Sequence, residues 1–205
     1  MKRGDRNNAG KDSSDLENRL FDLLDQMRNN EIERAQREGR KYQIHGLCAV
    51  LGYDPEQHAS YFNIPHFNTN VGEDLFRGKE IYLQDSEALL VLQEAMEIDG
   101  AILIGKDGKF MHSGKYMLPN LGIYSQHPEA AATYKKLQET ADAGTRHLNA
   151  VALSAQRPDL SFYALKSDHP QLRVFKGGSI YRSTVKGEAE YDSSVYQAVS
   201  GIDYR

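Results

Sequence analysis

The chain has 205 residues, of which 40% are hydrophobic, and this length suits one domain with a sizeable core and excludes two full domains. A formal net charge of -4 and a pI near 6.0 argue against a protein that coats nucleic acid. A single cysteine, Cys48, excludes an intrachain disulfide and a cysteine-rich zinc site, and no signal peptide or bilayer-length apolar run is recognisable, so we expect a cytoplasmic protein without a membrane partner.

The N-terminal part of the chain combines a polar tail with an amphipathic helix. Residues 1–14 offer almost nothing to bury and are expected to be a disordered tail. Apolar residues then recur on one face at helical spacing, which predicts an N-terminal helical segment over residues 15–34 with a polar continuation that stops at Gly39. These apolar residues are Leu16, Leu20, Phe21, Leu23, Leu24 and Met27.

A compact apolar run over residues 44–51 is typical of a central strand. Gly46 inside this run indicates a close backbone approach by a packed helix or by a ligand. Residues 55–78 are aromatic, rich in Asn and broken by Pro65, which predicts a long ordered loop, and His58 and His66 within it are expected to be packing or surface histidines.

The rest of the chain alternates between helix-like and strand-like patterns, so we expect an α/β fold with a mixed central β-sheet flanked by helices. After the last strand, residues 183–205 have little to bury and predict a loosely packed tail. The elements expected in chain order are a helix from residue 85 or 86 to 96, a strand over 101–105, a turn over 106–109 into a strand over 110–112, helices over 129–140 and 145–156, and strands over 161–165, 172–175 and 180–182.

Two stretches carry candidate chemistry. Asp99 stands where a predicted helix meets a predicted strand, and its carboxylate either accepts hydrogen bonds from neighbouring backbone N–H groups or serves as a metal ligand or general base. The stretch Gly144-Thr145-Arg146-His147 opens a helix, where unpaired N–H groups and an arginine fork attract phosphate. In the alternative for this stretch, Thr145 caps the helix and Arg146 and His147 lie on its exposed face.

Taken together, these motifs resemble the signature set of diadenylate cyclase domains, the nucleotide-cyclising domains of DNA integrity scanning proteins and of related bacterial and archaeal enzymes. The resemblance covers roughly residues 35–182, the expected cyclase domain. Within the family, the chain is most similar to the stand-alone archaeal-type enzymes, in which the residue after Arg-His is often apolar, as Leu148 is here. The residues that carry it are Arg37-Glu38-Gly39-Arg40, Gly46, Asp99-Gly100-Ala101, Leu118-Pro119, Gly144-Thr145-Arg146-His147 and Arg173-Val174-Phe175-Lys176.

The resemblance implies condensation of two ATP molecules into cyclic di-AMP with release of two pyrophosphates, using Mg²⁺, Mn²⁺ or Co²⁺. It implies that Asp99 holds the metal or takes a proton, that Arg146 with Thr145 and the helix start binds the leaving pyrophosphate, and that His147 binds the polyphosphate or the metal. The remaining ATP-binding residues that it implies are Gly100, which lets the nucleotide approach the backbone, Ala101, Gly144, Leu118 in the adenine pocket, and Ser167 with Asp168 at the phosphates.

Three positions depart from the family pattern. Leu148 stands where many bacterial members have a second arginine, Asn149 replaces a small apolar residue, and Asp168 replaces a residue that is often glutamate. These departures motivate an alternative, a catalytically weakened nucleotide-binding or cyclic di-AMP-sensing module of the same fold.

Active sites in this family face each other in pairs, so the resemblance also implies a homo-oligomer with face-to-face sites. The N-terminal helix either sets that oligomeric state or packs on its own sheet. A DNA partner is not expected, because the chain is acidic and no helix-hairpin-helix region follows the cyclase-like stretch.

Overall fold

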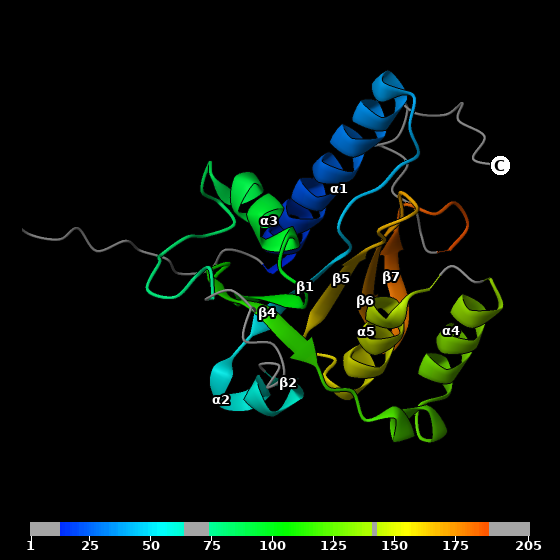
Figure 1. The fold of residues 1–205 in the computed structure, drawn as a ribbon. Coiled ribbons are helices and arrows are strands. Elements are labelled where there is room, and N and C mark those ends of the chain that lie inside the picture. Colours follow the sequence, from blue (N-terminus) through cyan, green and yellow to red (C-terminus); the bar gives the residue numbers. More distant parts are fainter. Residues whose placement is uncertain (1–12, 64–73, 141–142, 189–205) are drawn as a thin grey trace, which may run out of the picture.

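Seven strands form one mixed sheet in the order β2-β4-β3-β1-β5-β6-β7 in the computed structural model, which describes residues 13–63, 74–140 and 143–188 (Figure 1). β1 pairs in parallel with β3, and the other pairings are antiparallel. The strands are β1 (Leu47–Tyr53), β2 (Phe62–Asn63), β3 (Ala101–Gly105), β4 (Phe110–Met117), β5 (Ser161–Leu165), β6 (Leu172–Lys176) and β7 (Ser179–Ser183).

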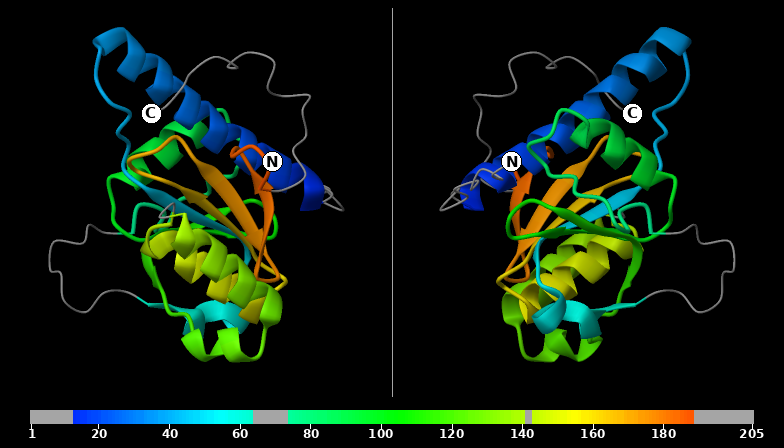
Figure 2. Two further views of the ribbon diagram at one scale, coloured as in Figure 1. Left: turned by 90° about the vertical axis from the view of Figure 1, so that its right-hand side faces the viewer. Right: turned by 90° about the vertical axis from the view of Figure 1, so that its left-hand side faces the viewer.

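Helices cover both faces of this sheet, as the two side views in Figure 2 show. α1 (Ser13–Glu38) and α3 (Ala88–Met96) lie on one face, and α4 (Pro128–Glu139) and α5 (Thr145–Gln156) lie on the other. The short helices α2 (Pro55–His58), η1 (Ala59–Tyr61) and η2 (Leu121–Ser125) connect these elements. The protein therefore has the α/β architecture that its sequence predicts, with two apolar layers, one on each face of the sheet.

β1 lies fourth of the seven strands, which confirms the prediction of a central strand, although it begins at Leu47 rather than at residue 44. Its side chains alternate between the two cores. Leu47 and Ala49 pack on the side of α1 and α3, whereas Cys48 and Val50 pack on the side of α5. Burial on both faces explains why this segment reads as a continuous apolar run.

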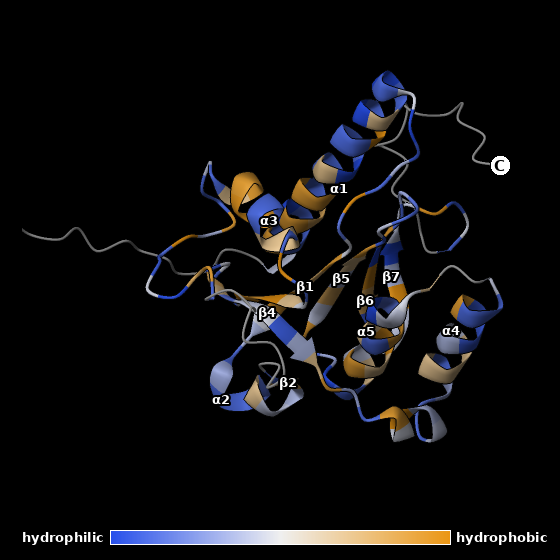
Figure 3. Cartoon of the chain, in the orientation of Figure 1, coloured by the Kyte–Doolittle hydropathy of each residue, from blue (hydrophilic) through white to orange (hydrophobic). Residues whose placement is uncertain are grey.

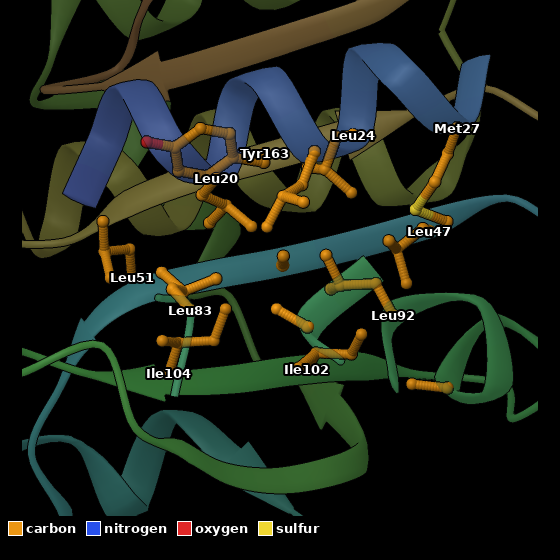
Figure 4. Packing of buried hydrophobic residues seen from close by; sticks show 14 of the residues in the cluster. Leu20, Leu24, Met27, Leu47, Leu51, Leu83, Leu92, Ile102, Ile104 and Tyr163 are labelled. Carbon is orange, nitrogen blue, oxygen red and sulfur yellow. The ribbon is translucent and has the colours of Figure 1, made fainter. Parts of the chain in front are cut away.

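α1 packs its apolar face on its own sheet. This confirms the second alternative for the N-terminal helix, in which it packs on the sheet of its own chain. Leu20 and Leu24 are fully buried, and Figure 4 shows them with Met27 directed toward the side chains of β1 and β3. Colouring by hydropathy shows the apolar residues of α1 concentrated in its N-terminal half, and the rest of the helix is mainly hydrophilic (Figure 3). Because this helix supplies part of the core, it is an integral element of the domain.

The start of α1 differs from the prediction. The helix begins at Ser13, so Ser13 and Ser14 belong to its first turn rather than to a tail, and its polar continuation runs to Glu38, as predicted. Gly39, with a φ of 63°, ends it as expected. Of the predicted tails, residues 1–12 and 189–205 lie outside the described residues. The prediction of a loosely packed tail is wrong for residues 183–188, because Ser183 is buried at the end of β7 and Glu188 pairs with the buried Arg173.

The long loop predicted from residue 55 is wrong for residues 55–63, which form α2, η1 and β2. Asp54 caps α2 by accepting a hydrogen bond from the Glu56 N–H at 3.0 Å. His58 is a buried packing residue, as expected, and its Nδ1 accepts a hydrogen bond from the Asp54 N–H at 2.9 Å. His66 lies outside the described residues.

Candidate functional site

A hollow of about 530 Å³ opens at the ends of the inner strands of the sheet, where β3 begins, β4 and β5 end and α5 starts. A volume of this size suits one small-molecule ligand. The residues that line it are Asp99–Ala101, Lys115–Met117, Ala143–His147, Asn149 and Leu165–Asp168, with Cys48 at its base. Two stretches that are far apart in the sequence, around Asp99 and around Arg146, thus meet in one site.

Asp99 binds two side chains at the mouth of β3. Its Oδ1 lies 2.6 Å from Nη2 of Arg146, and its Oδ2 accepts a hydrogen bond from the Tyr116 hydroxyl at 3.0 Å. The carboxylate therefore takes part in side-chain interactions across the hollow. Its side chain is 66% exposed, and an ion pair this exposed contributes at most about 1 kcal/mol, so a phosphate can displace Arg146 at little cost.

Gly100 lines the hollow, and the backbone explains why a glycine stands there. Its φ is 124°, and a Cβ at this position would lie 2.6 Å from the carbonyl carbon of Gly114. Gly114 itself has a φ of 66° and lies in β4 at an irregularity of the β3–β4 pairing. Close packing of two backbone segments thus requires Gly100, independently of the nucleotide approach implied for it.

Gly144 occupies the N-cap position of α5, and Thr145 is the first helical residue. The alternative in which Thr145 caps the helix is therefore wrong. Because glycine has no side chain to cap the helix, the backbone N–H groups of the first turn carry the partial positive charge that favours an anion. Arg146, whose side chain is 37% exposed, adds a full positive charge at the same place.

His147 is buried rather than exposed, in contrast to the alternative for the Arg-His pair. Its ring meets Phe175 edge-on, and its Nε2 has no hydrogen-bond partner among the described residues. Burial lowers the pKa of His147 to about 3, and the positive charges of Arg173 and Lys166 act in the same direction. The imidazole is therefore neutral at physiological pH, and His147 belongs to the lining of the hollow although its Nε2 is buried.

Ser167 and Asp168 follow β5 and line the hollow as the sequence implies. Burial alone would raise the pKa of Asp168, but the nearby imidazole of His169 and the ammonium of Lys166 outweigh it, and the pKa lies below its ordinary value. The carboxylate of Asp168 is accordingly ionised at neutral pH.

A second hollow of about 1160 Å³ adjoins the first and shares Arg146, Ser167 and Asp168 with it. It extends between the C-terminal half of α1 and residues 40–46. A ligand with a long anionic extension thus has room on both sides of the Arg146 side chain.

Leu118 does not line the hollow, and the residue is 48% exposed. Its neighbour Met117 supplies the apolar contact there, with its Sδ 3.6 Å from the Cys48 Sγ. The adenine contact implied for Leu118 finds no support in this geometry. Cys48 is fully buried, which confirms the prediction of a packing residue, and burial raises the pKa of its thiol to about 12.

The departures at positions 148 and 149 have different surroundings. Leu148 packs against the core on the α5 side of the sheet, and its carbonyl oxygen accepts a hydrogen bond from the Tyr124 hydroxyl at 3.0 Å. Asn149 lines the hollow. An apolar residue at position 148 therefore contributes to packing.

Lys115 and Tyr116 line the hollow but do not stand out in the sequence. The β3–β4 pairing explains why. A regular hairpin continuing from the Ile104–Phe110 pair would place Ser113 opposite Ala101, but two register shifts place Lys115 there. If residue pairs are counted outward from the turn, β4 is identified correctly, but Ser113 is placed opposite Ala101 in place of Lys115.

The donor set of the hollow fits a divalent cation that is shared with a phosphate ligand. Within the described residues no group of three or more His, Cys, Asp or Glu side chains forms a complete metal site. Mg²⁺ commonly binds proteins through one or two carboxylates together with substrate phosphates, and the Asp99 carboxylate provides a ligand of that kind, whereas the Nε2 of His147 is a buried nitrogen.

Comparisons with known proteins identify the fold only. The chain matches no family model and no curated protein. It is similar to a solved structure described as the hypothetical membrane spanning protein from Bacillus cereus, with 14% sequence identity and a TM-score of 0.50. The match covers 83% of this chain and 63% of that chain. In the described part of the present chain, helices are too short or too polar to cross a bilayer.

Proposed function

We propose that this protein is a diadenylate cyclase that condenses two ATP molecules into cyclic di-AMP and releases two pyrophosphates. The observation that carries the proposal is the meeting of Asp99, Arg146, the start of α5 and Ser167 in one hollow. A carboxylate beside an arginine and a helix N-terminus is the combination that phosphoryl transfer from a polyphosphate requires.

In each of the two proposed steps, a ribose 3′-hydroxyl releases its proton to water while its oxygen forms a bond to an α-phosphorus, the bond from that phosphorus to the bridging oxygen breaks, and pyrophosphate leaves. Asp99 would hold a Mg²⁺, Mn²⁺ or Co²⁺ ion together with the phosphates, and the ion would supply charge neutralisation there. Arg146 exchanges its ion pair with Asp99 for phosphate oxygens, and the first turn of α5 at Thr145 donates N–H groups to the same anion.

The number of reacting groups argues for a second protomer. Each copy of the chain has one Asp99, one Arg146 and one start of α5 in the hollow, whereas the reaction joins two nucleotides. We therefore propose that two copies of this chain bring their hollows face to face, so that each bound ATP supplies the 3′-hydroxyl for the other.

Incubation of the purified protein with ATP and Mn²⁺ or Mg²⁺, followed by chromatography and mass spectrometry, tests the proposal. Cyclic di-AMP is the expected product, and Asp99→Asn should abolish its formation while the circular dichroism spectrum stays unchanged. The rate per protomer should fall on dilution below the dissociation constant of the pair. Product formation by the Asp99→Asn protein at the normal rate would contradict the role given to Asp99.

Nucleotide binding without any turnover would favour the alternative, a binding or sensing module of the same fold. Absence of turnover could also result from an oligomer that keeps the hollows apart. A deletion of the residues before Ala35 would not test this case, because α1 supplies Leu20 and Leu24 to the core and its removal would unfold the domain. Sedimentation of the intact protein with and without ATP makes that distinction.

A further inference from the structure

The carboxylate of Asp99 is held from two sides, by one charged group and one neutral group. Arg146 contacts Oδ1 at 2.6 Å and the Tyr116 hydroxyl donates to Oδ2 at 3.0 Å. All three side chains line the same hollow. These two contacts respond differently when an anionic ligand enters.

Arg146 is the partner that a polyphosphate removes. Its ion pair with Asp99 is largely exposed and therefore weak, and a phosphate group offers the guanidinium a stronger bidentate partner. The Tyr116 hydroxyl carries no charge and has a single O–H to donate. A phosphate therefore competes for Arg146 much more strongly than for Tyr116, and the bond from Tyr116 to Oδ2 is the one that persists.

The backbone around Tyr116 makes that bond a built feature of the fold. Tyr116 lies in β4, paired with Asn63 of β2 on one side and adjacent to the Lys115–Ala101 pair on the other. The irregularity at Gly114, on which Gly100 packs, brings this part of β4 level with the mouth of β3. A tyrosine has only two side-chain torsions, so little conformational freedom is lost when its hydroxyl is placed.

We infer that Tyr116 is a positioning residue that fixes the orientation of the Asp99 carboxylate for a divalent cation bound together with a nucleotide. When the polyphosphate draws Arg146 away, Tyr116 keeps Oδ2 in place, and Oδ1 is the oxygen that is released. This inference rests on the proposed function in assigning a cation to Asp99, but it concerns binding and does not depend on turnover.

Direct Mn²⁺ titration tests this inference without a catalytic readout. Free Mn²⁺ is measured by electron paramagnetic resonance with the protein in excess over an ATP analogue that has a methylene group between the α- and β-phosphorus atoms, so that the analogue, which itself binds Mn²⁺, is held in the site. Tyr116→Phe removes only the hydroxyl and should weaken Mn²⁺ binding about 10-fold, as loss of an outer-shell partner of a metal ligand typically does. The affinity for the analogue without metal should stay unchanged, which a general structural defect would not allow.

Tyr181→Phe is the matched control, because Tyr181 is also an exposed strand tyrosine but lies on β7, outside the hollow. Its Mn²⁺ affinity should equal that of the unmodified protein, and Asp99→Asn should show the largest loss. Equal Mn²⁺ affinities of the unmodified and Tyr116→Phe proteins would overturn the inference, whatever the turnover. Tyr116-dependent Mn²⁺ binding in a protein that forms no cyclic di-AMP would support the inference and count against the proposed cyclase activity.

Discussion

A side chain at Gly46 would collide with Arg146, since a Cβ at position 46 would lie 2.8 Å from the Nη1 atom of the guanidinium. The close approach that a glycine in this apolar run indicates is thus made by the side chain of Arg146, in the first turn of the packed helix α5. Gly46 precedes β1 and also lines the second hollow, so it sets the space in which Arg146 lies between the two hollows.

Gly46→Ala should therefore move Arg146 and leave the fold intact. The atom that must shift is the far end of a flexible side chain, and the φ of Gly46 does not lie in the left-handed region. We expect cyclic di-AMP formation to fall about 10-fold, which corresponds to about 1.4 kcal/mol, with a melting temperature close to that of the unmodified protein. In an Arg146→Ala background the same change should have no further effect, and an additive loss would show that Gly46 acts by another route.

Gly100→Ala should destabilise the fold, because it combines an unfavourable φ of 124° with a 2.6 Å contact to the backbone of Gly114. We expect a loss of about 3 kcal/mol or more in the free energy of unfolding, measured by urea titration. Gly144→Ala is the control for stability, since a Cβ there meets no atom within 4 Å. Similar losses in the two variants would contradict the packing argument.

Removal of the Glu188 charge should be costly, because Glu188 neutralises a fully buried arginine. Its two carboxylate oxygens lie 2.6 and 2.7 Å from Nε and Nη2 of Arg173. Glu188→Gln should lower the free energy of unfolding by about 3 kcal/mol, because a buried guanidinium loses a carboxylate that binds two of its nitrogens. Replacement of both residues, as Arg173→Met with Glu188→Leu, should be less destabilising than the single change, and a larger loss would mean that the charge on Arg173 has a further role.

Asp159 should make the free energy of unfolding fall as the solution becomes acidic. The hydrogen bond from Arg157 holds the pKa of Asp159 below its ordinary value, and His58 adds a second hydrogen bond. An unfolded aspartate has a pKa of about 3.9, so this stabilisation is present above that pH and is lost as the pH falls through the lower folded pKa. The free energy of unfolding of Asp159→Asn should be lower at pH 7 and should change less between pH 5 and pH 3, as urea titrations at several pH values would show.

Local patterns in the sequence were sufficient for the regular elements. Short apolar runs and helical spacing predicted α5, β3 and β5 with the boundaries that the structure has, because each of these segments buries the face that its own pattern defines. The pattern failed at residues 55–63, where Asp54 and Pro55 start a short helix that no apolar periodicity marks.

The candidate site shows the limit of sequence reasoning more clearly. The sequence alone identified Asp99 and Arg146 by residue type and motif, but only the tertiary structure placed them 2.6 Å apart, since their separation depends on how β3 and α5 meet at the ends of the inner strands of the sheet. The two register shifts in the β3–β4 pairing, one of them at Gly114, brought Tyr116 into the site, and Leu118 lies outside its lining. The physical reason is that a strand's sequence determines its alternation between two faces, whereas its register depends on backbone packing against the neighbouring strands.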